Sequence, residues 1–282
     1  LLIPPFHGER MRAYGQLICD IAEKVFQTLP INQTFVTRPV MQEISMQVIL
    51  QAVFGLHEGK RLQEIKQLMA YLSDTFSSPF SSSFLFFDFL QKDLGAWSPW
   101  GKFVRQRAKV DELIYAEIAE RRTKSEAHGV DILSLLMEAR YEDGSAMSDK
   151  ELRDELMTLL FAGHETTATA MAWSLYWIHR TPGVKEKLLE ELDAIDDFSD
   201  LIGISRLPYL SAVCNETLRI TPVIMLIFAR EVQEPFEVLE HKLETGHMLF
   251  GCIYLLHQRE DLYPQPKQFK PERFLERQFS PY

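Results

Sequence analysis

Side chains that can carry protons lie together in the stretch from Ala162 to Thr167, which reads AGHETT. The Glu165 carboxylate can act as a positioned acid or base, and the Thr166 hydroxyl both donates and accepts hydrogen bonds. On a helix, Ala162, Gly163 and Thr166 are three or four residues apart, so they share one face of little bulk. Such a face can receive a wide planar group or pack closely against another helix, and the spacing alone leaves both interpretations open.

His164 and Glu165 also begin the pattern H-E-x-x-H, in which two histidines one helical turn apart bind zinc. The position of the second histidine is occupied by Ala168. The pattern is therefore incomplete, so we predict no zinc site here and assign no metal ligand in the chain.

A long helix from Ser148 to about Arg180 is predicted to position this stretch. Ser148 and Glu151 have the spacing of a capping box at its start, and a proline–glycine pair follows its end. In its middle, Gly163 lowers helix propensity by roughly 1 kcal/mol. The Thr166 hydroxyl can bond back onto the preceding turn, which tends to bend a helix. Local rules are thus broken at the centre of a well-marked helix, where function is expected.

A second constellation combines Glu216 and Arg219 with Arg273. The first two are three residues apart on a helix predicted from Pro208 to just before Pro222, and Arg273 lies in the sequence P-E-R-F. An exposed helical pair contributes only tenths of a kcal/mol, whereas a buried pair needs further hydrogen bonds to offset desolvation. Because the helix is apolar over much of its surface, we interpret the pair as buried, with Arg273 as a candidate third member.

The composition excludes several classes of protein. The 282 residues are 46% apolar and 25% charged, which suits a globular protein, and 40 acidic against 30 basic residues disfavour general nucleic-acid binding. The three cysteines, Cys19, Cys214 and Cys252, are scattered and predict no disulfide framework, which indicates a reducing compartment. No apolar run is long enough for a transmembrane helix.

The remaining pattern is mostly helical up to Pro222. Further helices are predicted at 7–29, 38–54, 60–76, 99–124, 131–140 and 184–195. The charged residues of the 99–124 helix are interpreted as a solvated face. Beyond Pro222 the runs 223–229, 236–239 and 248–254 predict short strands. The phenylalanine-rich segment 84–89 is either folded onto the core or a mobile rim for an apolar ligand.

Five features occur in an order that resembles one family. They are the A-G-x-E-T-T stretch, the E-x-x-R of Glu216 and Arg219, Arg230 after an apolar run, the pair Tyr263-Pro264, and P-E-R-F around Arg273. In this combination the chain resembles the haem-thiolate monooxygenases, the cytochromes P450, of bacterial type. The resemblance implies a mainly α fold with a small β region near the C-terminus. It also implies that residues 1–282 form a single, incomplete domain, because the family's haem-cysteine loop would follow Tyr282.

The resemblance also implies roles for individual residues. Thr166 and Glu165 would be catalytic, the threonine holding oxygen and relaying a proton and the glutamate connecting it to solvent. Ala162 and Gly163 would make room for the haem, and Arg230 would bind a haem propionate. Glu216, Arg219 and Arg273 would be a structural triad. The substrate side would be lined by Val223, Ile224, Phe161 and the segment 84–89.

The implied cofactor is haem, with electrons from a reductase or ferredoxin that uses NAD(P)H. The implied partners are that redox protein and a small apolar substrate, such as a fatty acid or terpenoid, in the cytoplasm. Without the cysteine loop, residues 1–282 alone are expected to be inactive. The rival hypothesis is a non-enzymatic, all-helical binding or regulatory domain, in which the small residues of the long helix only pack against a neighbouring helix.

Overall fold

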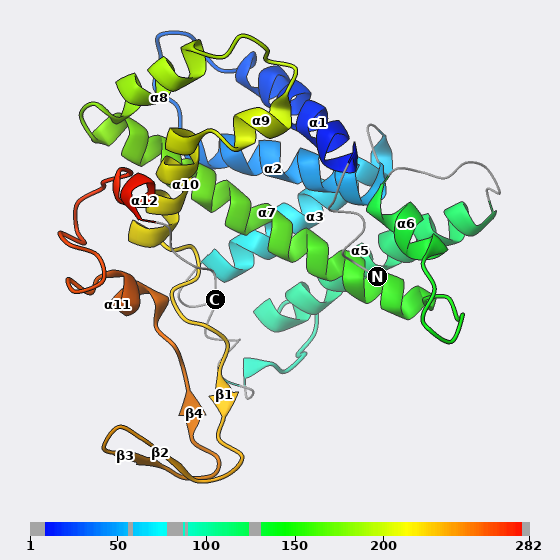
Figure 1. The fold of residues 1–282 in the computed structure, drawn as a ribbon. Coiled ribbons are helices and arrows are strands. Elements are labelled where there is room, and N and C mark those ends of the chain that lie inside the picture. Colours follow the sequence, from blue (N-terminus) through cyan, green and yellow to red (C-terminus); the bar gives the residue numbers. More distant parts are fainter. Residues whose placement is uncertain (1–8, 56–58, 78–86, 88–89, 124–130, 278–282) are drawn as a thin grey trace. The chain divides into compact units, whose positions relative to one another are not determined.

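The computed structural model describes residues 9–55, 59–77, 87, 90–123 and 131–277. The chain divides into two compact units, Leu1–Ala168 and Thr169–Tyr282. The boundary lies within the longest helix, α7 (Asp149–Arg180), which carries the AGHETT stretch (Figure 1). Of the predicted rim 84–89, only Phe87 is among the described residues, and its side chain is about half exposed.

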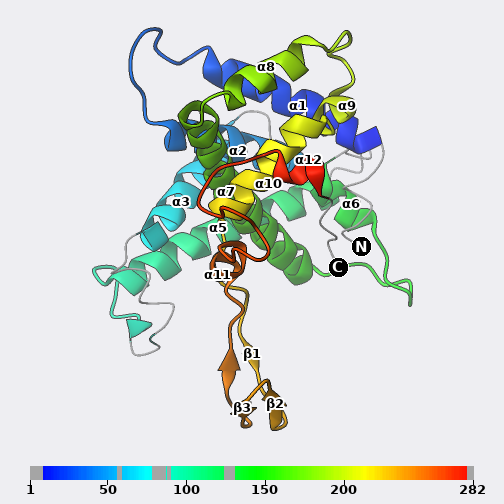
Figure 2. The ribbon, with the colours of Figure 1, turned by 60° about the vertical axis from the view of Figure 1, so that its left-hand side comes forward.

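Within its described residues the first unit is built of helices joined by loops, with one isolated bridge between Arg140 and Ala146 (Figure 1, Figure 2). Besides the first part of α7 it contains α1 (Glu9–Phe26), α2 (Thr37–Phe54), α3 (Lys60–Ser77), α5 (Pro99–Thr123) and α6 (Ile132–Glu138). These boundaries agree with the predicted helices to within a few residues at either end. The sequence period of 3.6 was therefore sufficient to locate the helices of this unit.

Local signals in the sequence fix the ends of these helices. Gly55 ends α2 in the left-handed conformation, with φ of 60°. Asp131 caps α6 by accepting a hydrogen bond from the Ser134 amide at 3.0 Å. The capping box of α7 forms as predicted, because the Ser148 amide donates to Glu151 at 2.7 Å and the Glu151 amide donates to the Ser148 hydroxyl at 3.3 Å.

The core of the first unit lies where α2, α3, α5, α6 and α7 face one another. Many of its side chains are fully buried, among them Leu50, Ile65, Ile114, Leu133 and Leu156. Burial of a side chain of this size contributes about 1.5–3 kcal/mol. The first half of α7, including its entry into the AGHETT stretch, is therefore held by a large apolar core.

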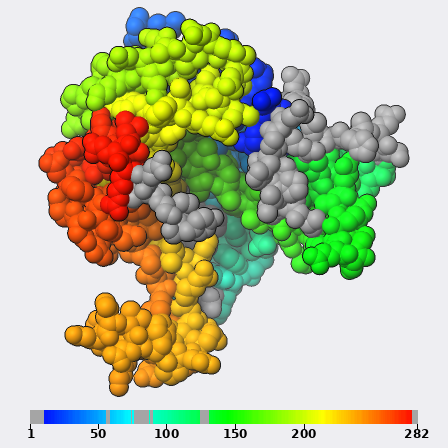
Figure 3. Space-filling view, in the orientation of Figure 1, coloured from blue at the N-terminus to red at the C-terminus, as the bar shows by residue number. Residues whose placement is uncertain are grey.

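The second unit combines helices with two small antiparallel sheets. It contains the end of α7, α8 (Val184–Asp193), α9 (Leu201–Ser205), α10 (Pro208–Ile220), α11 (Ile253–His257) and α12 (Arg273–Glu276). Strand β1 (Arg230–Glu231) pairs with β4 (Met248–Leu249), and β2 (Phe236–Val238) pairs with β3 (His241–Leu243). The strands form a hairpin that extends away from α10 and α11 of the same unit, orange in Figure 3. The predicted mainly α fold with a small β region is confirmed.

One predicted strand is wrong and another is correct only in part. The run 223–229 forms only an isolated bridge between Leu226 and Cys252. The run 248–254 begins with the short strand β4, but Ile253 and Tyr254 belong to α11. Side chains from Ile224 to Phe228 are 45–85% exposed. Strand propensity describes fit to a half-buried pleated surface, and within the described part of this unit no such surface covers the run. Helices α9 and α12 are too short to have been recognised by periodicity.

Within the described residues, no helix combines the length and the apolar character needed to cross a membrane.

Candidate functional site

Ala162 and Thr166 lie one helical turn apart on one side of α7, where Ala162 is exposed and Thr166 is half-buried. The Ala162 side chain is exposed, and the Thr166 hydroxyl donates to the Ala162 carbonyl at 2.5 Å. This is the bond back onto the preceding turn that the sequence predicts, and it places a hydroxyl beside a position with almost no side-chain bulk. A ligand lying against this face would meet a methyl group and a hydroxyl that can exchange its hydrogen bond.

Gly163 lies against α2 rather than on that exposed face. A Cβ atom on Gly163 would approach the Ile49 Cδ1 atom to 2.7 Å, which is too close. The Ser45 hydroxyl donates to the carbonyls of Gly163 and His164, at 3.2 and 2.8 Å. The two interpretations of the small residues therefore apply to different positions, with Gly163 serving helix packing and Ala162 lying on the open side.

Glu165 is held by side chains of α2. Arg38 forms an ion pair with its carboxylate, and the Gln42 amide donates to it at 2.9 Å. Burial alone would raise the pKa of Glu165, but the hydrogen bonds from Gln42 and Arg38 and the charge of Arg38 outweigh it and lower that pKa. At neutral pH this carboxylate is ionised and oriented, as a proton acceptor must be.

His164 is buried within the first unit. Its side chain is 4% exposed, and its Nδ1 atom has no hydrogen-bond partner among the described residues. The Nε2 atom lies 3.9 Å from a Glu165 carboxylate oxygen. Burial lowers the pKa of the imidazole. In the sequence His164 stands out only through the incomplete zinc pattern, and in the described part of the chain no cluster of three metal-ligating side chains occurs.

The predicted substrate-lining residues have different environments. Phe161 is half-buried and packs against the core of the first unit. In the second unit Val223 is half-buried, and Ile224 is 54% exposed at the start of the extended apolar run. A ligand could therefore contact only part of each side chain, and Ile224 offers the largest exposed fraction.

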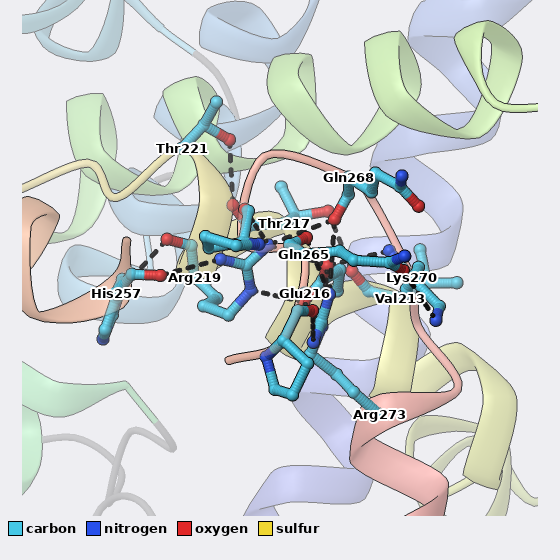
Figure 4. Close-up of polar contacts among 12 residues, drawn as sticks. Val213, Glu216, Thr217, Arg219, Thr221, His257, Gln265, Gln268, Lys270 and Arg273 are labelled. Carbon is cyan, nitrogen blue, oxygen red and sulfur yellow. Dashed lines mark hydrogen bonds and ion pairs between the residues drawn. The ribbon is translucent and has the colours of Figure 1, made fainter. Parts of the chain in front are cut away.

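The second unit brings Glu216, Arg219 and Arg273 together (Figure 4). Arg219 donates to the two Glu216 carboxylate oxygens at 2.7 and 2.9 Å, and Arg273 Nε donates to the same carboxylate at 3.1 Å. The Lys270 amide adds a further hydrogen bond at 2.8 Å. Glu216 is fully buried, Arg219 is 1% exposed and Arg273 is 10% exposed. This geometry agrees with the expectation that the Glu216–Arg219 pair is buried and that Arg273 is its third member.

The arginines of this cluster also bind the coil that follows α11. Arg219 donates to the carbonyls of His257 and Pro266, both at 2.9 Å, and Arg273 donates to the carbonyl of Pro264 at 3.1 Å. The His257 ring in turn contacts the Arg219 carbonyl at 3.1 Å. The surplus positive charge is thereby balanced by carbonyl dipoles, which is what allows a buried ion cluster to be stable.

Arg230 begins β1 opposite Leu249 on β4. Its side chain is exposed, and none of the described acidic residues forms an ion pair with it. The guanidinium is thus free to receive an anionic group of a ligand.

A buried ion cluster in the first unit was missed by the sequence analysis. Glu117, on the helix interpreted as solvated, is buried and accepts from Arg61 and Arg121. Arg121 also donates to Asp131 at 2.7 Å and to the carbonyl of Phe54. Arg121 is four residues from Glu117 on α5, whereas Arg61 lies on α3 and Asp131 at the start of α6, so spacing within α5 carried no signal for these last two partners.

Comparisons with known proteins assign the chain. The sequence profile of the family described as Cytochrome P450 matches residues 1–281. The putative cytochrome P450 135B1 of Mycobacterium bovis is 36% identical over 282 residues, which is 100% of this chain and 57% of that protein. The putative cytochrome P450 138 of Mycobacterium tuberculosis is 34% identical over 284 residues, which is 100% of this chain and 60% of that protein. The chain thus spans somewhat more than half the length of these relatives.

Two solved structures share the fold. A retinoic acid-bound cyanobacterial CYP120A1 superimposes with a TM-score of 0.81 and 21% sequence identity over 98% of this chain and 61% of that one. The cytochrome P450DA heme domain superimposes with a TM-score of 0.74 and 22% identity over 97% of this chain and 60% of that one. The motifs of the sequence, the helical fold and the profile match over nearly all of its length agree, and this chain belongs to the cytochrome P450 family.

Proposed function

We propose that the protein containing residues 1–282 is a haem-dependent monooxygenase, which inserts one atom of O2 into an apolar organic substrate. The observation that carries the proposal is the ionised, anchored Glu165 beside Thr166 and the exposed Ala162, in a chain of the cytochrome P450 family. We also propose that these residues form part of one haem domain.

The residues on the exposed side of α7 fit a flat cofactor. Ala162 offers a small, exposed position, and Gly163 contributes by allowing α7 to lie close to α2 rather than by touching the haem. Arg230 offers an exposed guanidinium, whose geometry suits a propionate. When bound, the haem would supply the activation of oxygen, with electrons from a reductase or ferredoxin that uses NAD(P)H.

Thr166 and Glu165 would supply the proton. The Thr166 hydroxyl now donates to the Ala162 carbonyl, and rotation about its Cα–Cβ bond would free it to donate to a group on the exposed side. Glu165 keeps its charge at neutral pH and is fixed by Arg38 and Gln42. It would accept protons from solvent and replace the one that Thr166 gives up.

The substrate would be apolar. Ile224 and its successors present a large exposed apolar surface in the second unit, and Phe161 and Val223 are half-buried. Fatty acids and terpenoids are the substrate classes that we propose for this lining. Retinoic acid, bound in the cyanobacterial structure of the same fold, is an apolar molecule of comparable chemistry.

The proposal is tested with the full-length protein and a Thr166→Ala variant. A red-shifted, thiolate-type band in the carbon monoxide difference spectrum is expected of the parent. The variant should keep its fold and consume reductant, but its product per reducing equivalent should fall by up to about tenfold. This loss is smaller than the roughly 10²-fold expected when a fully positioned acid is removed. Peroxide and product are quantified together, and the adjacent, exposed Thr167→Ala serves as control.

Unchanged coupling in Thr166→Ala would remove the threonine from the proton relay. Absence of a thiolate-type band in the parent would instead favour the non-enzymatic helical domain.

A further inference from the structure

One face of α2 contacts the centre of α7. Its residues Arg38, Gln42, Ser45 and Ile49 are four, three and four positions apart, so at 100° per residue they lie within about 60° around the helix. We call this face the α2 stripe. Over about three turns of α2 it reaches three consecutive residues of α7, 163–165. The two helices therefore cross here, and the contacts of the stripe converge on the middle of the AGHETT stretch.

Two members of the α2 stripe hold the backbone of α7. Gly163 has no side chain, which leaves room for Ile49, and this contact sets the distance between the helices. The Ser45 side chain is buried, and its hydroxyl donates to the carbonyls of Gly163 and His164 at 3.2 and 2.8 Å. A hydroxyl has one hydrogen, so the two carbonyls share it. Because both carbonyls come immediately before Glu165, the shared bond fixes the rotation of α7 where the acid is attached.

The other two members hold the Glu165 carboxylate at both of its oxygens. Arg38 forms an ion pair with Oε1, and the Gln42 amide donates to Oε2 at 2.9 Å. Donors on both oxygens restrict rotation of the carboxylate, which a single donor would allow. The described groups whose charge acts on Glu165 are Arg38 on α2 and His164 on α7, with the His164 Nε2 atom 3.9 Å from Oε2. The position of the acid is thus set mainly from α2.

We propose that Gln42 and Ser45 are positioning residues for proton delivery, which fix the Glu165 carboxylate relative to Thr166 while Arg38 keeps it charged. The inference rests on the proposed function, because this positioning matters only if Glu165 replaces the proton that Thr166 gives up. Ser45 acts through the backbone of α7, and Gln42 acts through the carboxylate that it holds. Rotation of the Glu165 side chain would change its distance to the hydroxyl, and rotation of α7 would move both groups relative to a bound ligand.

The first test reads the carboxylate and not the reaction. Carbon-13 spectra of glutamate-labelled full-length protein, recorded on the diamagnetic carbon monoxide form and assigned with Glu165→Gln, follow the titration of this group. Gln42→Leu removes a donor and Arg38→Gln removes the charge, so either change should raise the pKa of Glu165 above that of the parent. Gln47→Leu is the matched control, because Gln47 is a half-buried glutamine of the same helix that donates to Glu43. It should leave the titration unchanged.

The second test measures product per reducing equivalent at equal haem content. Ser45→Ala and Gln42→Leu should each lower it about threefold, less than the roughly 10²-fold cost of losing a positioned acid. Ser45→Thr restores the hydroxyl and should recover most of the loss. Ser134→Ala is the control, because it removes a half-buried hydroxyl bonded to Arg121 in the buried ion cluster of the first unit. It should lower stability without changing coupling, as Ser45→Ala would if Ser45 were only structural.

The outcomes separate this inference from the function on which it rests. Suppose that the parent shows a thiolate-type carbon monoxide band. Parental titration of Glu165 in Gln42→Leu, or parental coupling in Gln42→Leu and Ser45→Ala, then overturns the positioning alone. Absence of the band in the parent overturns the monooxygenase proposal, and the positioning with it. If Ser45→Ala does not fold, Gln42→Leu decides, because the half-buried side chain keeps its approximate size.

Discussion

The centre of α7 and the Glu216 cluster both surround a carboxylate with arginine and amide donors, yet they differ in how far their polar groups are satisfied. In the Glu216 cluster the carboxylate is fully buried and receives bonds from Arg219, Arg273 and the Lys270 amide. At the centre of α7 the Glu165 side chain is 31% exposed, and His164 keeps a buried acceptor without a partner among the described residues. A saturated network fixes the chain, whereas an unsaturated one retains capacity for a ligand or a proton.

The buried cluster around Glu117 shows that saturation, rather than a family motif, marks a structural network. Arg121 there joins Glu117, Asp131 and the last carbonyl of α2, and Arg61 adds a bond from α3. No sequence motif indicated the Glu117 cluster, yet its geometry resembles that of the Glu216 cluster. The distinction therefore applies within both units.

The largest expected effect is that of breaking the saturated cluster. Glu216→Ala leaves Arg219 buried and uncompensated, so we expect a loss of about 3–5 kcal/mol in the free energy of unfolding, together with poor haem incorporation. Urea denaturation and the haem-to-protein ratio measure the two effects. The exposed Glu276→Ala on α12 is the control, expected within about 0.5 kcal/mol of the parent. A loss below about 1 kcal/mol, the range of a surface pair, would contradict the structural role.

Gly163→Ala tests whether the glycine packs or faces the ligand. The new methyl group would crowd the end of the flexible Ile49 side chain, so a cost of up to about 1 kcal/mol is set against a gain of roughly 1 kcal/mol in helix propensity. Ile49→Val removes the crowded Cδ1 atom, so Gly163→Ala should be more favourable in the Ile49→Val background than in the parent. An equal effect of Gly163→Ala in both backgrounds, measured by urea denaturation, would contradict the packing role.

His164 should make stability depend on pH, in a window that it shares with His257, because burial lowers the pKa of both imidazoles. Because its folded pKa lies below the ordinary 6.5, the unfolded chain binds more protons below that pH, and stability falls as the pH drops from 6.5 toward the lowered pKa. The slope is at most about 1.4 kcal/mol per pH unit. His164→Gln should flatten this part of the stability curve, and the exposed His179→Gln on the same helix should not. Parallel curves for His164→Gln and the parent would show that the ring is not held neutral.

The smallest effect on stability is expected of Arg230→Leu, because the guanidinium is exposed and lacks an ion pair among the described residues. The free energy of unfolding should change by less than about 0.5 kcal/mol. Transfer of haem to apomyoglobin should nevertheless become faster than in the parent. Lys242→Leu on β3 of the same hairpin is the control. Equal transfer rates for Arg230→Leu and the parent would refute the propionate role.

Much of the helical fold was predictable because its signals are local. The capping box of Ser148 and Glu151, the glycine stop after Phe54 and the 3.6-residue period each depend on residues within one turn. The strand predicted at 223–229 failed because a strand depends on neighbours outside the run, and Phe228 is 85% exposed in the structure.

In the candidate site, only contacts between residues that are close in the sequence could be predicted. Spacing on one helix indicated the Glu216–Arg219 pair and the bond from Thr166 to Ala162. Arg38 lies more than a hundred residues before the Glu165 that it anchors, and Ile49 lies more than a hundred residues before the Gly163 that it contacts. Contacts of this kind arise from packing and have no periodic signature, so the buried acceptor on His164 could not have been read from the sequence.

The hydrogen bond from the Lys270 amide to Glu216 has a consequence for local opening. Residues 258–272 contain no helix or strand, and such a coil would ordinarily exchange its amide hydrogens by independent fraying. Here the Lys270 amide, the Pro266 carbonyl and the His257 carbonyl all bind side chains that project from α10. Opening of the coil would break these bonds to α10, so we expect its bonded amide to exchange as part of the same cooperative unit as that helix, although the coil has no regular structure of its own.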